Sequence, residues 1–235
     1  VRAYATTEAG TAYGNDVPIS INLVDVDANS YNVIQIGTQV WMKENLRTTK
    51  YNDGTDIPNV TDNDAWKTLG TGAYCWYDNN GAYSDAYGAM YNFMVTESGK
   101  ICPTGWHVPS NNDWVQMENY LIANGYNWDG STSGNRLAKA LGAATGWVIS
   151  ATPGAVGNTD YPEYRNKSCF TAMPGGLRFG NHGTFDYAGG LGYWWTSTEN
   201  TSNYGIYRQM CSDLDNVYDT YDTKRNGMSI RCLKD

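Results

Sequence analysis

The sequence of 235 residues predicts an α+β fold in which β structure predominates. Short aromatic or β-branched runs alternate with glycine-rich turns along most of the chain, which is typical of short strands. The composition agrees, because 19 tyrosines, 9 tryptophans and 26 glycines favour strands and tight turns. Helical spacing of apolar residues is clear in only two segments. We therefore expect short twisted antiparallel strands, two helices and long irregular loops.

The first elements are two strands, Val1–Thr6 and Thr11–Ile19, around the turn Glu8-Ala9-Gly10. A lone hairpin is marginally stable in water, so this one suggests part of a larger unit. Its residues VRAYAT and AGTAYGN resemble the last hairpin of a fibronectin type III domain, a type common in tandem on bacterial surface proteins. We therefore expect residues 1–22 to be the C-terminal remnant of such a domain and residues 31–235 to be the main domain.

The main domain opens with a predicted hairpin over Tyr31–Leu46 that turns at Gly37-Thr38. Asn, Asp, Gly and Pro then punctuate Tyr51–Gly81, which indicates irregular surface structure. A short helix is predicted within Gly88–Thr96. The remaining elements lie beyond Pro109.

The clearest helix begins after Pro109, where Ser110 can accept the backbone N–H of Asp113 as an N-cap and Gly125 supplies the stop. Its apolar face is predicted to carry Trp114, Met117, Leu121 and Ile122. A second helix is predicted at Gly134–Leu141. The expected strands beyond it are Cys169–Ala172, Tyr193–Ser197, Gly205–Met210, Asn216–Tyr221 and Met228–Leu233.

The charge balance excludes one class of partner. The formal net charge is -8 and the pI is about 4.7, so no basic footprint is available to neutralise a phosphate backbone. Anionic membrane surfaces are disfavoured for the same reason. No run approaches the roughly 20 apolar residues that span a bilayer. We expect no nucleic-acid partner and no transmembrane segment in this chain.

Cysteine and histidine offer little for metal chemistry. The five cysteines occur singly, with no C-x-x-C pair, and only His107 and His182 could assist them. Because zinc sites need clustered ligands, we expect no metal and no cofactor. Scattered cysteines in an acidic chain rich in Tyr, Gly and Asn fit an oxidising, extracytoplasmic compartment.

Several motifs in a fixed order carry a family resemblance. They are IGTQVWM at 36–42 with ENL at 44–46, YGAMYN at 87–92, ICPTGWHVPS at 101–110 with Trp114, AMPGGLR at 172–178, GYWWTST at 192–198 and GMSIRC at 227–232. Together they resemble the Fibrobacter succinogenes major paralogous domain over residues 31–235. The resemblance implies a C-type-lectin-like fold, related to the formylglycine-generating-enzyme type. It also implies a secreted or lipid-anchored protein of Bacteroidetes or their relatives.

The resemblance bears on the cysteines as well. Cys102 and Cys232 match positions typical of the family, and C-type-lectin-like folds commonly tie the first helix region to the last strand, so this disulfide is the expected pairing. Two buried thiols are the alternative. A second bridge between Cys169 and Cys211 would leave Cys75 free, and the sequence does not decide it. The close cysteine pair of oxidase relatives and the Glu-Pro-Asn or Gln-Pro-Asp triplets of calcium-binding lectins are absent.

The segment between Glu199 and Lys224 is where we expect recognition. Tyr combined with Asn, Ser and Gly gives large rigid contact area together with adaptable hydrogen bonding. The alternative is that these tyrosines only cover the strands, and acidic turn residues often merely face solvent. One of Trp194 and Trp195 should face the core. The expected ligand-binding residues are Asn200, Asn203, Tyr204, Tyr207, Tyr218 and Tyr221, joined by Asn181, His182 and Tyr187 of the preceding glycine-rich loop.

These observations predict a surface-displayed, adhesin-like module and not an enzyme. Its partner would be a glycan or protein on a host, a substrate or a neighbouring cell, bound through tyrosine stacking and neutral hydrogen bonds. The expected location is extracytoplasmic, at the cell surface or secreted, with a lipid anchor in the full-length protein. One alternative is a structural or assembly subunit of a surface fibre. Another is an accessory enzyme of polysaccharide processing, which requires an activated thiol or two carboxylates roughly 5 to 9 Å apart.

Overall fold

The structure, a computed structural model, describes residues 2–7, 10–16 and 23–235. β1 (Arg2–Thr7) and β2 (Gly10–Asp16) form an antiparallel hairpin, as the sequence predicts. The predicted turn residues Glu8 and Ala9, and the predicted end of the second strand at 17–19, lie outside the described residues. The rest of the chain is an α+β domain of short antiparallel strands, few helices and many loops.

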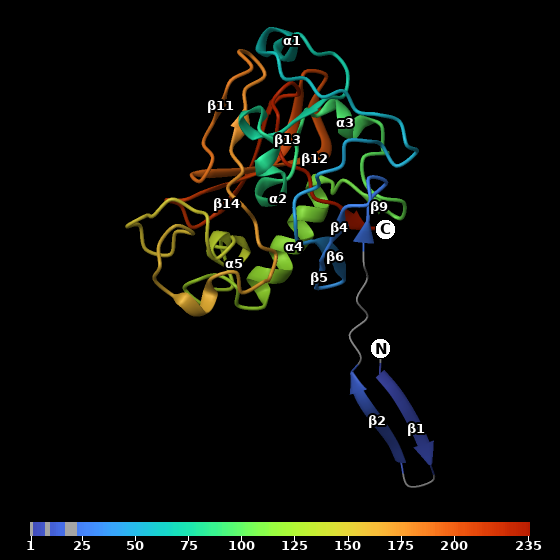
Figure 1. The fold of residues 1–235 in the computed structure, drawn as a ribbon. Helices are drawn as coiled ribbons and strands as arrows, with labels where there is room; N and C mark the ends of the chain where they lie inside the picture. The colour runs from blue at the N-terminus through green and yellow to red at the C-terminus, as the bar shows by residue number, and fades with distance from the viewer. Residues whose placement is uncertain (1, 8–9, 17–22) are drawn as a thin grey trace.

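A four-stranded sheet joins the beginning of the main domain to its end (Figure 1). Its strands, in spatial order, are β5 (Val33–Ile36), β6 (Gln39–Met42), β15 (Leu233–Lys234) and β9 (Trp106–His107). The predicted hairpin is confirmed, with Gly37 between β5 and β6 at a φ of +62° that favours glycine. Leu233 pairs with both Trp41 and His107, so the last strand lies between the first hairpin and the strand before the long helix.

The second main sheet carries the C-terminal third of the chain. It consists of β12 (Leu191–Thr201), β13 (Tyr204–Cys211) and β14 (Val217–Thr223) in that spatial order. The β13–β14 pairing runs without a break from Tyr204 opposite Thr223 to Met210 opposite Val217. Because side chains alternate between faces, this register fixes which β13 and β14 residues share a side.

The remaining elements are short. The two-stranded pairs are β3 (Leu23–Val24) with β4 (Ser30–Tyr31), β7 (Tyr74–Cys75) with β8 (Met90–Tyr91), and β10 (Leu177–Arg178) with β11 (Phe185–Asp186). The α-helices are α1 (Asn63–Lys67), α2 (Ser84–Tyr87), α3 (Met94–Glu97), α4 (Asn111–Ala123) and α5 (Ala138–Leu141). The 3₁₀ turns are η1 (Tyr77–Asn79), η2 (Gly81–Tyr83) and η3 (Pro162–Tyr164).

The long helix α4 forms where its sequence predicts. Ser110 accepts the backbone N–H of Asp113, and the Asp113 carboxylate accepts the backbone N–H of Ser110, which completes a capping box. Trp114, Met117 and Leu121 are buried on one face. Gly125 follows with a φ of +73°, a conformation that ends helices. The other two predicted helices are shorter than expected. Of the predicted helix Gly134–Leu141, only Ala138–Leu141 is helical, and the helix predicted within Gly88–Thr96 is Met94–Glu97.

The predicted strand Cys169–Ala172 is a loop, and a buried arginine gives the reason. Cys169 and Thr171 have φ values of +57° and +59°, which no strand accommodates. This backbone turns the carbonyl oxygens of Phe170 and Thr171 toward the fully buried Arg231 guanidinium, which donates to both and to Asn45 Oδ1. Burial lowers the pKa of Arg231 to about 9. The segment preceding Leu233 is likewise irregular, so little of the predicted strand Met228–Leu233 is a strand.

Two core clusters lie on the two faces of the β12–β14 sheet. Trp194 faces the side of α4, with its ring centroid 6.5 Å from that of Trp114. Trp195 faces the other side and packs edge-on against Phe93 at 5.3 Å. Both tryptophans are buried, so the predicted alternation places each in a core. A buried tryptophan needs a hydrogen-bond partner for its indole N–H. Both indole groups have one, because Trp194 donates to Asn45 and Trp195 donates to the Tyr91 carbonyl oxygen.

The expected disulfide between Cys102 and Cys232 is present, and it spans 130 residues of chain. The second bridge that the sequence left open does not form, since Cys169 and Cys211 are both free. Cys75 is a buried thiol whose pKa burial raises to about 12. Across the described ranges, no helix is long and apolar enough to cross a membrane.

Candidate functional site

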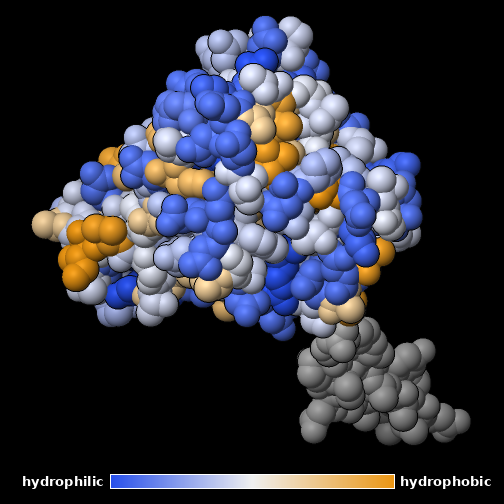
Figure 2. Space-filling model, turned by 45° about the horizontal axis from the view of Figure 1, so that its top comes forward, coloured by the Kyte–Doolittle hydropathy of each residue, from blue (hydrophilic) through white to orange (hydrophobic). Residues whose placement is uncertain are grey.

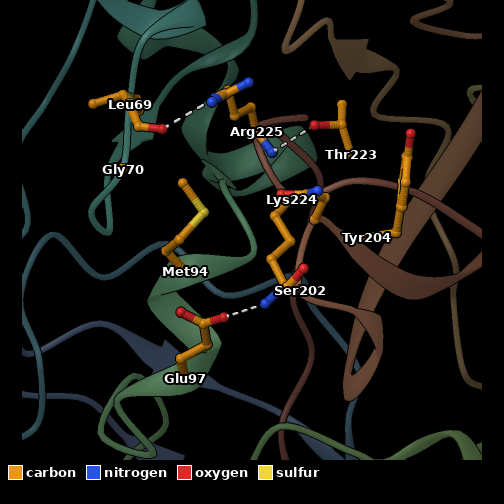
Figure 3. Close-up of a pocket in the computed structure, with 10 residues that line it drawn as sticks. Leu69, Gly70, Met94, Glu97, Ser202, Tyr204, Thr223, Lys224 and Arg225 are labelled. Atoms are coloured by element: carbon orange, nitrogen blue, oxygen red, sulfur yellow. Dashed lines mark hydrogen bonds and ion pairs between the residues drawn. The ribbon is translucent and has the colours of Figure 1, made fainter.

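A polar hollow of about 500 Å³ lies where the β12–β13 turn and the end of β14 meet α3 and the segment after α1 (Figure 3). We call it the hairpin hollow. Its lining residues are Leu69, Gly70, Met94, Glu97, Ser202, Asn203, Tyr204, Thr223, Lys224 and Arg225. They come from four separate parts of the chain, so the hollow exists only in the folded domain.

Lys224 forms the floor of the hairpin hollow. Its ammonium lies 2.6 Å from a Glu97 carboxylate oxygen and 3.1 Å from one of Glu199, and 5.2 Å from the Phe93 ring centroid. Burial alone would lower the pKa of Lys224, but the hydrogen bonds that its ammonium donates to these two glutamates raise the pKa above its usual value. The lysine therefore stays charged and ties α3 to β12 and β14.

Tyrosine forms one wall. Tyr204 is 41% exposed, and its ring stands upright beside Thr223 in Figure 3. Its partner is Tyr221, 57% exposed, whose ring centroid lies 5.9 Å away in an edge-on arrangement. The main chain at Asn203 is fixed, because its carbonyl oxygen accepts the backbone N–H of Lys224, while its side chain is exposed.

Arg225 forms the opposite wall, and a buried arginine positions it indirectly. Arg178 donates to the carbonyl oxygens of Val60 and Thr61 and stacks 4.2 Å from the Trp66 ring centroid, which fixes α1. The Trp66 indole then donates to the Arg225 carbonyl oxygen at 2.8 Å. Arg225 Nε donates to the Leu69 carbonyl oxygen at 3.2 Å, and among the described residues its exposed guanidinium donates to no other acceptor.

The structure brings four of the nine predicted ligand residues to this region. Asn203 and Tyr204 line the hairpin hollow, and Tyr221 packs on Tyr204. Asn200 lies exposed near the end of β12, next to the Glu199 that binds Lys224. The predicted residues that lie together therefore gather around the β12–β13 hairpin and the adjoining part of β14.

Tyr207 and Tyr218 are placed differently from that expectation. Tyr207 is only 7% exposed and packs edge-on against Trp195 at 5.8 Å, so its ring belongs to the core and is not available to a ligand. Tyr218 is 41% exposed, but it pairs with Gln209 while Tyr221 pairs with Ile206. An odd spacing along a strand puts Tyr218 and Tyr221 on opposite faces of the sheet.

The three loop residues form a separate group. Asn181, His182 and Tyr187 are exposed, and Phe179 joins two of them, with its ring centroid 4.4 Å from His182 and 5.9 Å from Tyr187. The ring centroid of Tyr187 in turn lies 6.5 Å from that of Tyr193. Tyr193 is on the face of the β12–β14 sheet opposite Tyr204 and Tyr221. These residues therefore do not share one site with Tyr204.

Sequence reasoning missed all three charged residues that line the hollow. Glu97, Lys224 and Arg225 come from α3 and the end of β14, and nothing in their local sequence marks them. The one available signal was that oppositely charged residues flank the tyrosine-rich segment. No group of three or more His, Cys, Asp or Glu side chains in the described part of the chain is placed to hold a metal ion.

The fold and the hollow define an α+β domain that presents a loop-built polar site. The Fibrobacter succinogenes major domain family matches residues 34–234, and the chain belongs to this family. The match contains the whole lining of the hairpin hollow. Comparison with curated proteins and with solved structures finds no match.

Proposed function

We propose that this chain is an extracytoplasmic recognition module that binds a neutral glycan in the hairpin hollow. The observation that carries the proposal is a concave polar surface in which a tyrosine ring stands at one edge, beside fixed donors and acceptors of hydrogen bonds. A volume of about 500 Å³ falls in the range of about 300–1,000 Å³ typical of small-ligand sites. One or two sugar rings of a longer chain fit that scale.

The polar groups of the hollow suit hydroxyl-rich ligands. Glu97 can accept hydrogen bonds from hydroxyl groups, Arg225 can donate hydrogen bonds to hydroxyl oxygens, and the Asn203 amide can do both. The Tyr204 ring offers a flat apolar face of the kind that packs on the C–H side of a sugar ring. Because Lys224 holds Glu97 and Arg225 is tied to Leu69, little side-chain freedom is lost on binding.

The surface favours a glycan over a protein partner. Figure 2 shows a face that is mostly hydrophilic, with apolar patches that are small and separate. Stable protein interfaces bury about 800 Å² per partner around an apolar core. The hairpin hollow has no such core, because Leu69 and Met94 are its main apolar lining residues beside the tyrosine.

The same geometry argues against hydrolysis at this site. Glu97 and Glu199 both contact the Lys224 ammonium, so two carboxylates lie close together here, as a glycosidase requires. The Lys224 ammonium, however, contacts both carboxylates and lies between them. A glycosidase needs its substrate between the two carboxyl groups, and here the Lys224 ammonium takes that place. We therefore propose binding without catalysis.

The proposal extends to the fold and location of the chain. The disulfide between Cys102 and Cys232 joins the region before α4 to the last strand, which supports the C-type-lectin-like fold that the sequence resemblance implies. A disulfide also fits an oxidising compartment. A cell-surface or secreted protein, held by a lipid anchor in its full-length form and preceded by fibronectin type III-like domains, is the arrangement we propose.

A glycan array tests the proposal with a matched pair of variants. Tyr204→Ala and Tyr218→Ala remove equally exposed tyrosines from opposite faces of one sheet. We expect the wild-type protein and Tyr218→Ala to bind the same neutral glycans equally, and Tyr204→Ala to bind them about 5- to 30-fold more weakly. Wild-type binding that is undiminished in Tyr204→Ala, or that both variants weaken equally, would refute the hairpin hollow as the site.

A further inference from the structure

A second groove lies apart from the hairpin hollow, between the β3–β4 loop, the segment after β6 and the start of α2. It has a volume of about 270 Å³, and its floor includes the half-buried indole of Trp76. Asp27 and Arg47 are charged lining residues whose side chains are held by hydrogen bonds to neighbouring residues. We call it the Trp76 groove.

The Asp27 carboxylate is fixed on one side only. Its Oδ2 accepts the Thr49 backbone N–H at 2.6 Å, and the hydroxyl groups of Thr49 and Thr48. Its Oδ1 has no hydrogen-bond donor among residues 23–235, and the nearest cation is the Lys50 ammonium at 3.8 Å. Asp27 therefore presents a rigid carboxylate oxygen that is free to accept a hydrogen bond.

The loop that carries Asp27 is itself rigid. Asp25 accepts the backbone N–H groups of Asp27 and Asn29 through Oδ1, and the Tyr31 hydroxyl through Oδ2 at 2.7 Å. Ala28 adopts a φ of +65°, a left-handed conformation that non-glycine residues rarely keep without such support. The hydrogen bonds to Asp25 thus hold a strained turn, and this turn fixes the position of Asp27.

Arg47 supplies a hydrogen-bond donor to the groove. Its Nε donates to Asn29 Oδ1 at 3.2 Å, and its guanidinium lies 5.3 Å from the Tyr31 ring centroid. Nη2 donates to the Ser30 carbonyl oxygen at 3.4 Å. Nη1 donates no hydrogen bond among the described residues and lies 4.0 Å from the highly exposed Asp85 carboxylate. The guanidinium is therefore positioned through Nε and Nη2, while Nη1 is open to a ligand oxygen.

Trp76 completes the arrangement. Its ring packs edge-on against Tyr74 at 5.5 Å, which holds the indole plane in one orientation. Its indole N–H has no hydrogen-bond partner within the described chain, whereas half-buried Trp128 donates to Asp215 at 2.9 Å. A flat ring with a free N–H, a carboxylate acceptor and a guanidinium donor form a compact set for a polyhydroxylated ring.

We propose that the Trp76 groove is a second, independent glycan-binding site. The ring of a neutral pyranoside lies on Trp76, while neighbouring hydroxyl groups donate to Asp27 Oδ1 and accept from Arg47. This inference rests on the proposed function and deepens it, because two separated sites select long or repeated glycans over short ones. Linking two weak sites on one ligand raises overall binding by about 10²–10⁴-fold without any new contact.

Nuclear magnetic resonance on the intact chain tests the groove directly, since each tryptophan gives one indole N–H signal. Trp76→Phe identifies the Trp76 signal by its loss. The probes are the methyl glycosides of glucose, galactose, mannose, xylose, fucose and N-acetylglucosamine. We expect at least one to shift the Trp76 signal saturably and to leave the Trp128 signal in place. Asp27→Asn should weaken that response about tenfold or more, because it removes a charged acceptor.

The variants separate this inference from the hairpin hollow. Tyr204→Ala should keep the Trp76 response, and Arg47→Met provides a second loss variant should Asp27→Asn disturb the loop. If no glycoside moves the Trp76 signal, or if the Trp76 and Trp128 signals move together, the groove is not a sugar site. If a glycoside shifts the Trp76 signal but Tyr204→Ala does not weaken binding on the array, the hairpin hollow is not a glycan site and the Trp76 groove is.

Discussion

Replacing both Cys102 and Cys232 by alanine removes the disulfide without leaving a polar group in the core, where both residues are buried. The bridge closes a loop of 130 residues, and the chain-entropy relation for such a loop gives about 5 kcal/mol at 25 °C. This figure describes restriction of the unfolded chain, so the folded structure should change little. We expect the double variant to fold and to lose most of that stability.

Urea unfolding followed by circular dichroism measures this loss. The matched control is the double variant Cys169→Ala with Cys211→Ala, which removes the same number of sulfur atoms from two free thiols. Its free energy of unfolding should lie within about 1 kcal/mol of the wild-type value. The reasoning is refuted if the Cys102/Cys232 variant is destabilised by less than about 1 kcal/mol, or if the control loses as much.

Three further predictions concern the scaffold and its pH dependence, each measured by urea unfolding. Ser110→Ala removes the α4 N-cap and should cost about 0.5–2 kcal/mol, and no loss would contradict the capping box. Glu118→Gln leaves the buried Arg208 guanidinium without its carboxylate and should cost about 3–5 kcal/mol, so a neutral result would mean that the ion pair is dispensable. Burial alone would raise the pKa of Asp27, but the hydrogen bonds that it accepts from Thr49 outweigh burial and lower the pKa. The Asp27 carboxylate therefore stabilises the fold at pH values above about 4, the pKa of an aspartate in the unfolded chain, and this stabilisation is lost as the pH falls below that value. Asp27→Asn should therefore reduce the acid-side slope of stability against pH, and an unchanged slope would contradict this.

Local sequence signals predicted the local structure well. Ser110 and Asp113 lie three residues apart at the start of an apolar helical face, and Gly37 lies between two alternating runs, so a short window contains the whole cause of each element. The Cys102–Cys232 bridge is different, because it joins positions 130 residues apart and followed only from the family resemblance. Distant contacts of this kind are set by topology, which no local pattern reveals.

The failures have the same physical origin. The strand expected at Cys169–Ala172 is a loop because its carbonyl oxygens serve Arg231, a partner about sixty residues away. Tyr207 lies in the same tyrosine-rich segment as the exposed tyrosines, but strand alternation places its ring on the face that packs against the core. The predicted ligand residues were chosen as a class, whereas the register of β13 and β14 divides that class between two faces.

The two proposed sites also show what composition alone leaves out. The hairpin hollow depends on Lys224 and Arg225, which long-range contacts with Glu97 and Leu69 position. The Trp76 groove depends on a loop that Asp25 fixes and on a tryptophan about fifty residues further along. Aromatic richness predicted that the chain recognises something, but only the fold shows where aromatic rings meet fixed polar groups.

Isothermal titration of a neutral oligosaccharide selected on the array tests the central claim most directly. Tyr204→Ala should weaken binding about 5- to 30-fold, the scale expected for truncating a central aromatic contact, while Tyr218→Ala should bind like the wild-type protein. Equal affinities for all three proteins would contradict recognition through the hairpin hollow.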